Sequence, residues 1–161
     1  MFNEITGKLN NIIVVPEFGV TGSPYFVSGD KGCINGLSLN HTRGDILRAI
    51  LEGISFYVRD CFEQLKGPFN DVILFSATGG GSVSGKWLQI TSDILGKTVV
   101  KNKITEAGSL GAAIIAGIGY NVFSSFDDAI DSMVQIDTMF HPNFSYKEFY
   151  SKKFENYKLT K

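Results

Sequence analysis

The feature that most constrains the fold is the stretch DVILFSATGGGSVSGKW, residues 71–87, in which an apolar run ends in three consecutive glycines. The near-continuous apolar run at 72–75 is typical of a strand that is buried on both faces of a sheet. Glycines directly after such a strand let a ligand touch the backbone, and Ser84 can cap a helix whose N-terminus carries partial positive charge. The pattern predicts a turn that binds an anion or a nucleotide. The alternative is a tight turn without a ligand.

Two common nucleotide motifs fit this stretch poorly. From Gly80 the residues spell G-x-x-x-x-G-K, but Trp87 stands where a P-loop needs a Ser or Thr hydroxyl to hold magnesium. No apolar strand ending in a metal-binding Asp accompanies it, so a P-loop nucleotide hydrolase is disfavoured. A Rossmann motif is also disfavoured, because Ser84 occupies the sixth position counted from Gly79, where that motif has glycine or alanine.

Composition limits the classes of partner. The 161 residues suit a single domain over 1–161, with 43% hydrophobic and 19% charged residues. Fifteen Lys and Arg stand against sixteen Asp and Glu, and no basic block occurs, so neither nucleic acid nor an anionic membrane surface is indicated. No signal peptide or apolar span of membrane length occurs, and Cys33 and Cys61 are too few for a disulfide framework. We therefore expect a cytoplasmic protein.

Hydrophobic periodicity predicts alternating strands and helices. A capping box at Thr42 and Asp45 opens a long helix with apolar residues at 46, 50, 54, 57, 61 and 65. The helix at 107–119 is so rich in glycine and alanine that we expect another backbone to lie close against it. The other predicted elements are strands at 12–15, 33–39, 72–75 and 98–100, helices at 87–95 and 146–157, a short helix within 123–136, and a loop at 16–32.

No group of residues compels acid/base or metal chemistry. His41 and His141 are isolated, and a solvated or capping role is favoured for each. Glu52 lies in mid-helix and Glu106 opens the 107–119 helix, where a carboxylate suits the helix dipole. Asp93 is expected to face solvent or to cap the turn at Gly96. The sequence thus predicts no catalytic residue and no metal ligand in this chain.

The stretch GGGSVSGKWLQITSDILG, residues 79–96, resembles the adenosine motif of the FGGY carbohydrate kinases. In that motif the glycines are followed at fixed intervals by residues that match Ser84, Trp87, Gln89, Asp93 and Gly96. A second family signature is matched by Gly32, Ile34, Gly36, Leu37, Asp45, Ile46 and Ala49. The segments at 18–26, 106–117 and 140–143 are also similar to the family, in the same order along the chain.

The resemblance implies a three-layer α/β fold of the ribonuclease-H-like, actin-like type, a mixed sheet flanked by helices. It implies a kinase that uses ATP and Mg²⁺, releases ADP and transfers the γ-phosphoryl group to a sugar or polyol hydroxyl. By the same resemblance Gly80, Gly81 and Ser84 line the nucleotide site and Gly79 holds the turn, while the side chain of Lys86 is incidental.

Family members are much longer, and the resemblance places their sugar pocket and their aspartate base in an N-terminal half that has no counterpart here. We therefore expect 1–161 to be a C-terminal, nucleotide-binding half that is inactive when isolated. The alternative is a non-catalytic nucleotide-binding or regulatory module with the same fold. The identity of the sugar or polyol, and homodimer formation, are left open.

Overall fold

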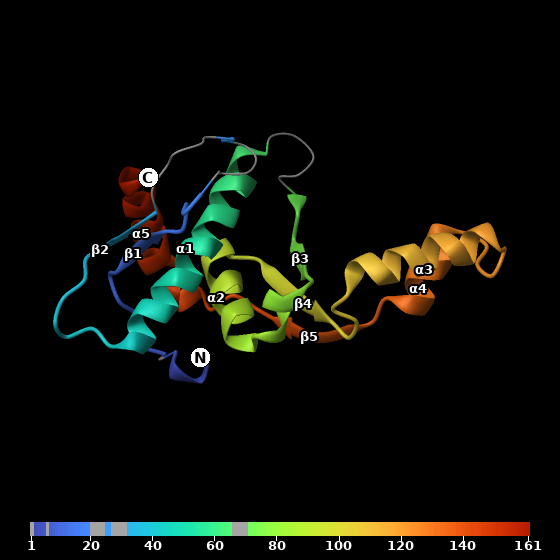
Figure 1. Ribbon diagram of the computed structural model, residues 1–161, viewed down its shortest axis with the longest axis horizontal. Helices are drawn as coiled ribbons and strands as arrows, with labels where there is room; N and C mark the ends of the chain where they lie inside the picture. The colour runs from blue at the N-terminus through green and yellow to red at the C-terminus, as the bar shows by residue number, and fades with distance from the viewer. Residues whose placement is uncertain (1, 6, 20–24, 27–31, 66–70) are drawn as a thin grey trace.

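The computed structural model describes residues 2–5, 7–19, 25–26, 32–65 and 71–161. Figure 1 shows a body that contains α1, α2 and α5, and an arm in which α3 and α4 lie side by side and extend away from it. The elements in chain order are η1 (Phe2–Glu4), β1 (Ile13–Val15), β2 (Cys33–Asn35), α1 (Arg43–Gln64), β3 (Leu74–Ala77), η3 (Gly80–Val83), α2 (Gly85–Leu95), β4 (Thr98–Asn102), α3 (Ala107–Gly119), α4 (Phe126–Met133), β5 (Ile136–Phe140), η4 (Phe144–Tyr146) and α5 (Lys147–Thr160).

The described strands form two small sheets. β1 and β2 pair antiparallel, whereas the second sheet has the order β3-β4-β5. β3 and β4 are parallel and are joined through α2, and β5 adds antiparallel to β4. A parallel pair needs a crossover connection, and α2 supplies it. This mixed sheet with helices packed on it agrees with the predicted α/β class.

Short-range signals place the helix ends. The Thr42 hydroxyl accepts a hydrogen bond from the Asp45 amide, and the Asp45 carboxylate accepts one from the Thr42 amide, so the predicted capping box is confirmed. The Ser84 and Ser125 side chains cap α2 and α4 by accepting a hydrogen bond from the amides of Trp87 and Asp128, without the reciprocal bond of a capping box. Gly96 ends α2 in the left-handed conformation, at φ 63°, which glycine adopts without strain.

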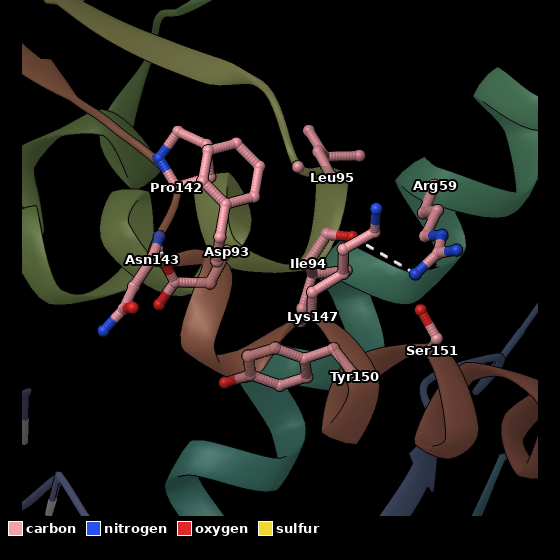
Figure 2. A pocket seen from close by; sticks show the side chains of 11 residues that line it. Arg59, Asp93, Ile94, Leu95, Pro142, Asn143, Lys147, Tyr150 and Ser151 are labelled. Atoms are coloured by element: carbon pink, nitrogen blue, oxygen red, sulfur yellow. Dashed lines mark hydrogen bonds between the residues drawn. The ribbon is translucent and has the colours of Figure 1, made fainter.

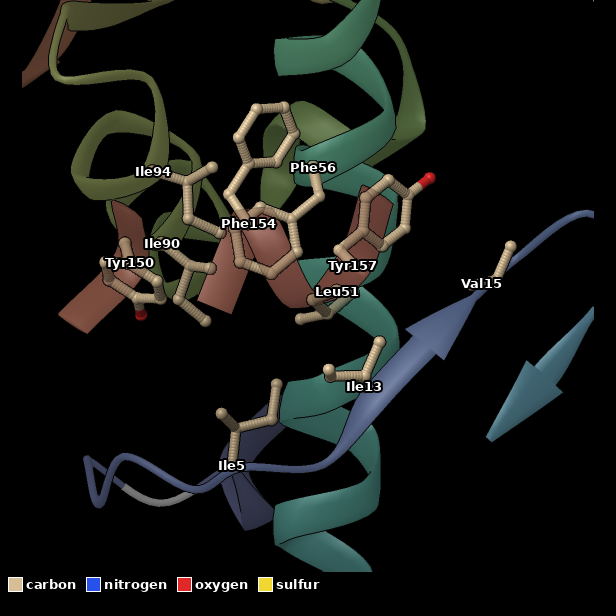
Figure 3. Packing of buried hydrophobic residues seen from close by; sticks show 10 residues of the cluster. All are labelled: Ile5, Ile13, Val15, Leu51, Phe56, Ile90, Ile94, Tyr150, Phe154 and Tyr157. Atoms are coloured by element: carbon tan, nitrogen blue, oxygen red, sulfur yellow. The ribbon is translucent and has the colours of Figure 1, made fainter. Parts of the chain in front are cut away.

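The main hydrophobic core lies where β1, α1, α2 and α5 meet (Figure 3). Its centre is Phe56 on α1, whose ring centroid lies 5.7 Å from that of Phe154 and 5.5 Å from that of Tyr157. The core consists of Ile5, Ile13, Val15, Leu51, Phe56, Ile90, Ile94, Tyr150, Phe154 and Tyr157. Aromatic residues from the last helix therefore complete a core that the first half of the chain begins.

The strand after α1 is less buried than its sequence predicts. We expected 72–75 to be buried on both faces, but Ile73 is 78% exposed and Leu74 is 41% exposed. The prediction is wrong for this chain because β3 is an edge strand, which pairs only with β4 among the described residues. An apolar run reports what a strand prefers to contact, and not whether another element is present to cover it.

Two other elements differ from their predictions in extent or burial. β2 ends at Asn35 and not at residue 39, because Gly36 turns the chain with φ 83°. The predicted apolar stripe of α1 is only partly buried, and Leu65 at its end is exposed. The fully buried face of α1 consists of Gly44, Asp45, Arg48, Ala49, Leu51, Glu52, Gly53, Ser55, Phe56 and Asp60.

The glycine-rich helix α3 does not have the close neighbour that we expected along its length. No heavy atom lies within 4 Å of a Cβ built at Gly108 or Gly111, and Ile114 is the buried residue of α3. Only Gly117 is closely approached among the described contacts of this helix, by the ring of Phe123 at 2.7 Å. Much of α3 therefore presents small side chains to open space.

The buried face of α1 carries an ion cluster centred on Glu52, whose side chain is fully buried. Arg48 Nε donates to Glu52 Oε1 at 2.7 Å, and Lys153 Nζ donates to Oε2 at 2.6 Å. The Tyr150 hydroxyl donates to Oε1 at 3.1 Å, and Lys153 also donates to the Asn10 carbonyl oxygen at 2.7 Å. One carboxylate thus joins α1, α5 and the segment before β1.

We predict that Glu52→Gln lowers the free energy of unfolding by about 3–5 kcal/mol, because it leaves two buried cations without their carboxylate. The matched control is Glu63→Gln, since Glu63 pairs with Arg59 at 2.8 Å with the same i,i+4 spacing but has a side chain that is 45% exposed. The control should cost about 0.5 kcal/mol or less. Urea unfolding measures both, and equal losses would contradict the role given to Glu52.

Candidate functional site

The glycine run forms a tight turn between β3 and α2. Gly79 has φ 76°, and its amide donates to the Thr105 carbonyl oxygen at 2.9 Å, which ties the turn to the segment before α3. The Gly79 carbonyl oxygen accepts hydrogen bonds from the Ser82 amide at 3.1 Å and from the Ser82 hydroxyl at 2.7 Å. The turn is therefore fixed by its own backbone and by Ser82, before any ligand is considered.

The three glycines serve different geometries. A Cβ at Gly79 would meet no atom within 4 Å, but the positive φ of this residue strains any other side chain. A Cβ at Gly81 would lie 2.8 Å from Cζ3 of Trp87, so Gly81 makes room for the indole ring. A Cβ at Gly80 would meet nothing within 4 Å, and Gly80 has no positive φ. Gly80 is thus the position where an unstrained backbone is open to approach.

The structure brings all four predicted site residues together in this turn. Ser84 is buried, and its hydroxyl accepts a hydrogen bond from the Trp87 amide at 3.3 Å, so it caps α2. Lys86 points elsewhere, because its Nζ donates to the carbonyl oxygens of Asn3 at 3.3 Å and Ile5 at 3.0 Å. In this structure Lys86 fastens the N-terminal segment to α2.

The later residues of the motif hold α2 to the segment after β5. The Gln89 side-chain amide donates to Asp93 Oδ1 and to the His141 carbonyl oxygen, both at 2.8 Å. The Asn143 amide also donates to Asp93 Oδ1, at 2.8 Å. The prediction that Asp93 faces solvent or caps the Gly96 turn is wrong, because Asp93 is buried and pairs with a residue 50 positions away. The i,i+4 spacing of Gln89 and Asp93 was the sequence signal that could have indicated the hydrogen bond between their side chains.

A hollow of about 200 Å³ lies beside Asp93 (Figure 2). Tyr150, Lys147 and Asn143 stand around it, and Arg59 closes one side by donating to the Ile94 carbonyl oxygen at 3.3 Å. Burial raises the pKa of Asp93, although the hydrogen bonds from Asn143 and Gln89 act in the opposite direction. The hollow therefore contains a carboxylate that is costly to keep ionised.

A second hollow, of about 290 Å³ and mostly apolar, lies beside the glycine turn. Gly81 and Trp87 line it together with Phe75 on β3 and with Ile54 and Val58 on α1.

Metal-binding groups are sparse in the part of the chain that the structure describes. No three of its His, Cys, Asp and Glu residues come together as a site built from protein ligands alone would require. His41 Nδ1 accepts a hydrogen bond from the Ser38 amide at 2.9 Å, and His141 Nδ1 lies 3.2 Å from the Thr98 hydroxyl. Both histidines thus take part in local structure. None of the described helices is both long and apolar enough to cross a membrane.

We predict that Asp93→Asn changes how stability depends on pH. The folded pKa of Asp93 is raised, so the folded protein binds this proton more tightly than the unfolded chain does. The wild type should therefore gain stability relative to Asp93→Asn as the pH falls from about 7 to about 4, through the folded pKa. Chemical denaturation at each pH measures the difference, and comparing the two proteins cancels the other carboxylates. A pH-independent difference would contradict the prediction.

Known proteins are similar to this chain in sequence and in fold. Residues 4–120 match the sequence profile of the FGGY family of carbohydrate kinases, C-terminal domain. The chain is 29% identical over 156 residues to the xylulose kinase of Staphylococcus epidermidis. The aligned region covers 94% of this chain and 32% of that protein.

Solved structures agree in fold. A ligand-bound xylulose kinase from Lactobacillus acidophilus superposes with a TM-score of 0.80 at 24% identity, over 97% of this chain and 32% of that one. The Plasmodium falciparum glycerol kinase with ADP gives a TM-score of 0.75 at 26% identity, over 91% of this chain and 30% of that one. The chain thus spans about a third of the length of the relatives that it matches. Because the profile covers most of its residues, the chain belongs to the FGGY family of carbohydrate kinases and contains the C-terminal domain of that family.

Proposed function

We propose that this chain is the nucleotide-binding part of an ATP-dependent kinase that transfers the γ-phosphoryl group of ATP to a hydroxyl of a sugar or polyol. The observation that carries the proposal is the family profile over residues 4–120, which includes the whole glycine turn. The relatives named above are xylulose and glycerol kinases, and the glycerol kinase structure contains ADP. A nucleotide and a sugar or polyol are therefore the substrates that we propose for the complete protein.

In this proposal the glycine turn forms one wall of the adenosine site. Gly80 supplies backbone that a ligand can approach, since no heavy atom occupies the space where its Cβ would be. Gly79 and Ser84 hold the two ends of the turn, and Gly81 seats the Trp87 ring behind it. ATP supplies the phosphoryl group, and the residues of this chain bind and orient the nucleoside end.

Other parts of the catalytic machinery are proposed to come from the N-terminal region that longer relatives carry. These parts are the sugar pocket, the aspartate base and the groups that hold Mg²⁺ with the phosphates. The exposed Ile73 and Leu74 at the start of β3 and the small-residue surface of α3 support this division, because a second domain would cover them. We propose a cytoplasmic location and no nucleic-acid partner, in line with the balanced charge.

We predict that millimolar ADP shifts the amide NMR signals of residues 79–84 in the isolated chain, with weak affinity, because one wall of a cleft leaves the phosphates hydrated. Gly80→Val should abolish these shifts without unfolding the chain, since its side chain would enter open space. Its melting temperature should change by no more than about 2 °C.

The matched control is Gly81→Val, in which the new side chain meets the Trp87 ring. Because Trp87 is the one tryptophan of the chain, its fluorescence reports this displacement directly. Gly81→Val should shift the emission in the absence of nucleotide, and Gly80→Val should not. If ADP shifts signals far from the turn, or binds Gly80→Val equally well, the proposed adenosine wall is wrong.

We also predict that the isolated chain, purified free of host kinases, phosphorylates none of xylulose, gluconate and glycerol. Most positioning and electrostatic stabilisation of phosphoryl transfer would be missing without the base and the sugar pocket. A coupled assay for ADP release measures this. Turnover above the rate of a mock purification would show that this chain contains more of the active site than we propose.

A further inference from the structure

Lys161, far from the glycine turn in the sequence, has its side chain in a polar pocket. Lys161 Nζ lies 3.1 Å from Glu17 Oε1 and 3.2 Å from Asp60 Oδ2, and its side chain is only 15% exposed. Glu17 follows β1 and Asp60 lies on α1, so the ammonium group joins three separate parts of the chain. An ion pair this well covered is unlike the exposed pairs of the helix surfaces.

Two tyrosine rings complete the surroundings of this ammonium group. Nζ lies 3.3 Å from the centroid of the Tyr25 ring and 5.2 Å from that of Tyr57. The Tyr25 hydroxyl donates to Asp60 Oδ2 at 2.6 Å, and the side-chain amide of Gln64 donates to the Tyr25 hydroxyl. The faces of aromatic rings attract cations, so the two tyrosine rings and the two carboxylates all favour a positively charged group.

The pocket is built for positive charge. The Glu17 side chain is only 6% exposed, and Glu17 Oε1 has no partner with hydrogen-bond geometry among the described residues, although the Lys161 charge is close. Burial acts to lower the pKa of Lys161, but the nearby carboxylates of Glu17 and Asp60 outweigh burial and raise that pKa. Without a cation, two covered carboxylates would face each other uncompensated.

We propose that Glu17, Tyr25, Tyr57 and Asp60 form a binding cage for an alkylammonium group, and that Lys161 is its built-in occupant. A compact ammonium ion can approach a ring face and still donate to two carboxylates, whereas Ca²⁺ or Mg²⁺ takes six or more oxygen ligands. The cage fixes Tyr25 against α1 and the end of α5. It therefore holds part of the segment 18–26, whose sequence resembles the family.

The test is chemical rescue in the full chain. Lys161→Ala should lower the melting temperature by about 2–4 °C, since it empties the cage. Millimolar n-propylammonium should restore most of this loss by occupying the vacated space, and n-propanol, which has the same shape but no charge, should not. Lys161→Met should be destabilised but not rescued, because its side chain fills the path of the lost lysine stem.

Lys158→Ala is the matched control, because Lys158 lies in the last turn of α5, which Lys161 caps, and forms an exposed pair with Glu155 while its Nζ lies 4.9 Å from the centroid of the Phe154 ring. The melting temperature of Lys158→Ala should lie within about 1 °C of the wild-type value, and propylammonium should not change it. The cage is disproved if Lys161→Ala is as stable as the wild type, or if propanol rescues as well as the amine.

An NMR measurement on the unmodified chain tests the cage independently of any variant. The Hε protons of Lys161 should lie upfield of their random-coil position because of the Tyr25 ring current, and those of Lys158 should shift less. Random-coil Hε signals for Lys161 would contradict the cage even if the variants failed to fold.

Discussion

The structure depends first on one buried carboxylate. Glu52 lies in the middle of α1 and compensates two cations, Arg48 one turn before it and Lys153 from α5. Removing three such groups from water is costly, and the cost is offset only when all of them meet with good geometry. The cluster therefore favours one relative position of α1 and α5. That position brings the aromatic residues of α5 onto Phe56 and closes the core.

In the candidate site, the residues that build the glycine turn differ from the residue that a ligand can approach. Most motif residues build the turn or anchor α2: Ser84 caps the helix, and Gln89 and Asp93 hold the segment after β5. Among the glycines of residues 79–96, only Gly80 combines an unstrained backbone with open space. A motif can therefore be strongly specific for a family even though few of its side chains are available to contact a nucleotide.

Burial is uneven across the molecule. The half that contains β1, α1, α2 and α5 has a closed core and the paired charges of the Glu52 cluster, whereas β3 and the α3–α4 arm expose apolar surface. Exposed apolar area of this kind is typical of a surface that another element or a partner covers. The uneven burial agrees with the comparison with the longer relatives, in which the matching region is about a third of the protein.

The sequence by itself determined what short-range physics controls. It determined the caps at Thr42 and Ser84, the stop at Gly96, and the family, because these depend on residues within a few positions of one another. The α/β class followed from the order of predicted strands and helices, and the actin-like fold from the family resemblance; the solved kinases confirm the fold.

Only the tertiary structure decided which surfaces are covered and which charges meet. Asp93 bonds to a residue 50 positions away, Glu52 pairs with Lys153 across 101 positions, and the apolar β3 lies at an exposed edge. Periodicity shows which side chains avoid water, but it cannot show whether a partner element is present to cover them. Long-range ion pairs form only after packing has excluded water around them, so no local pattern in the sequence encodes them.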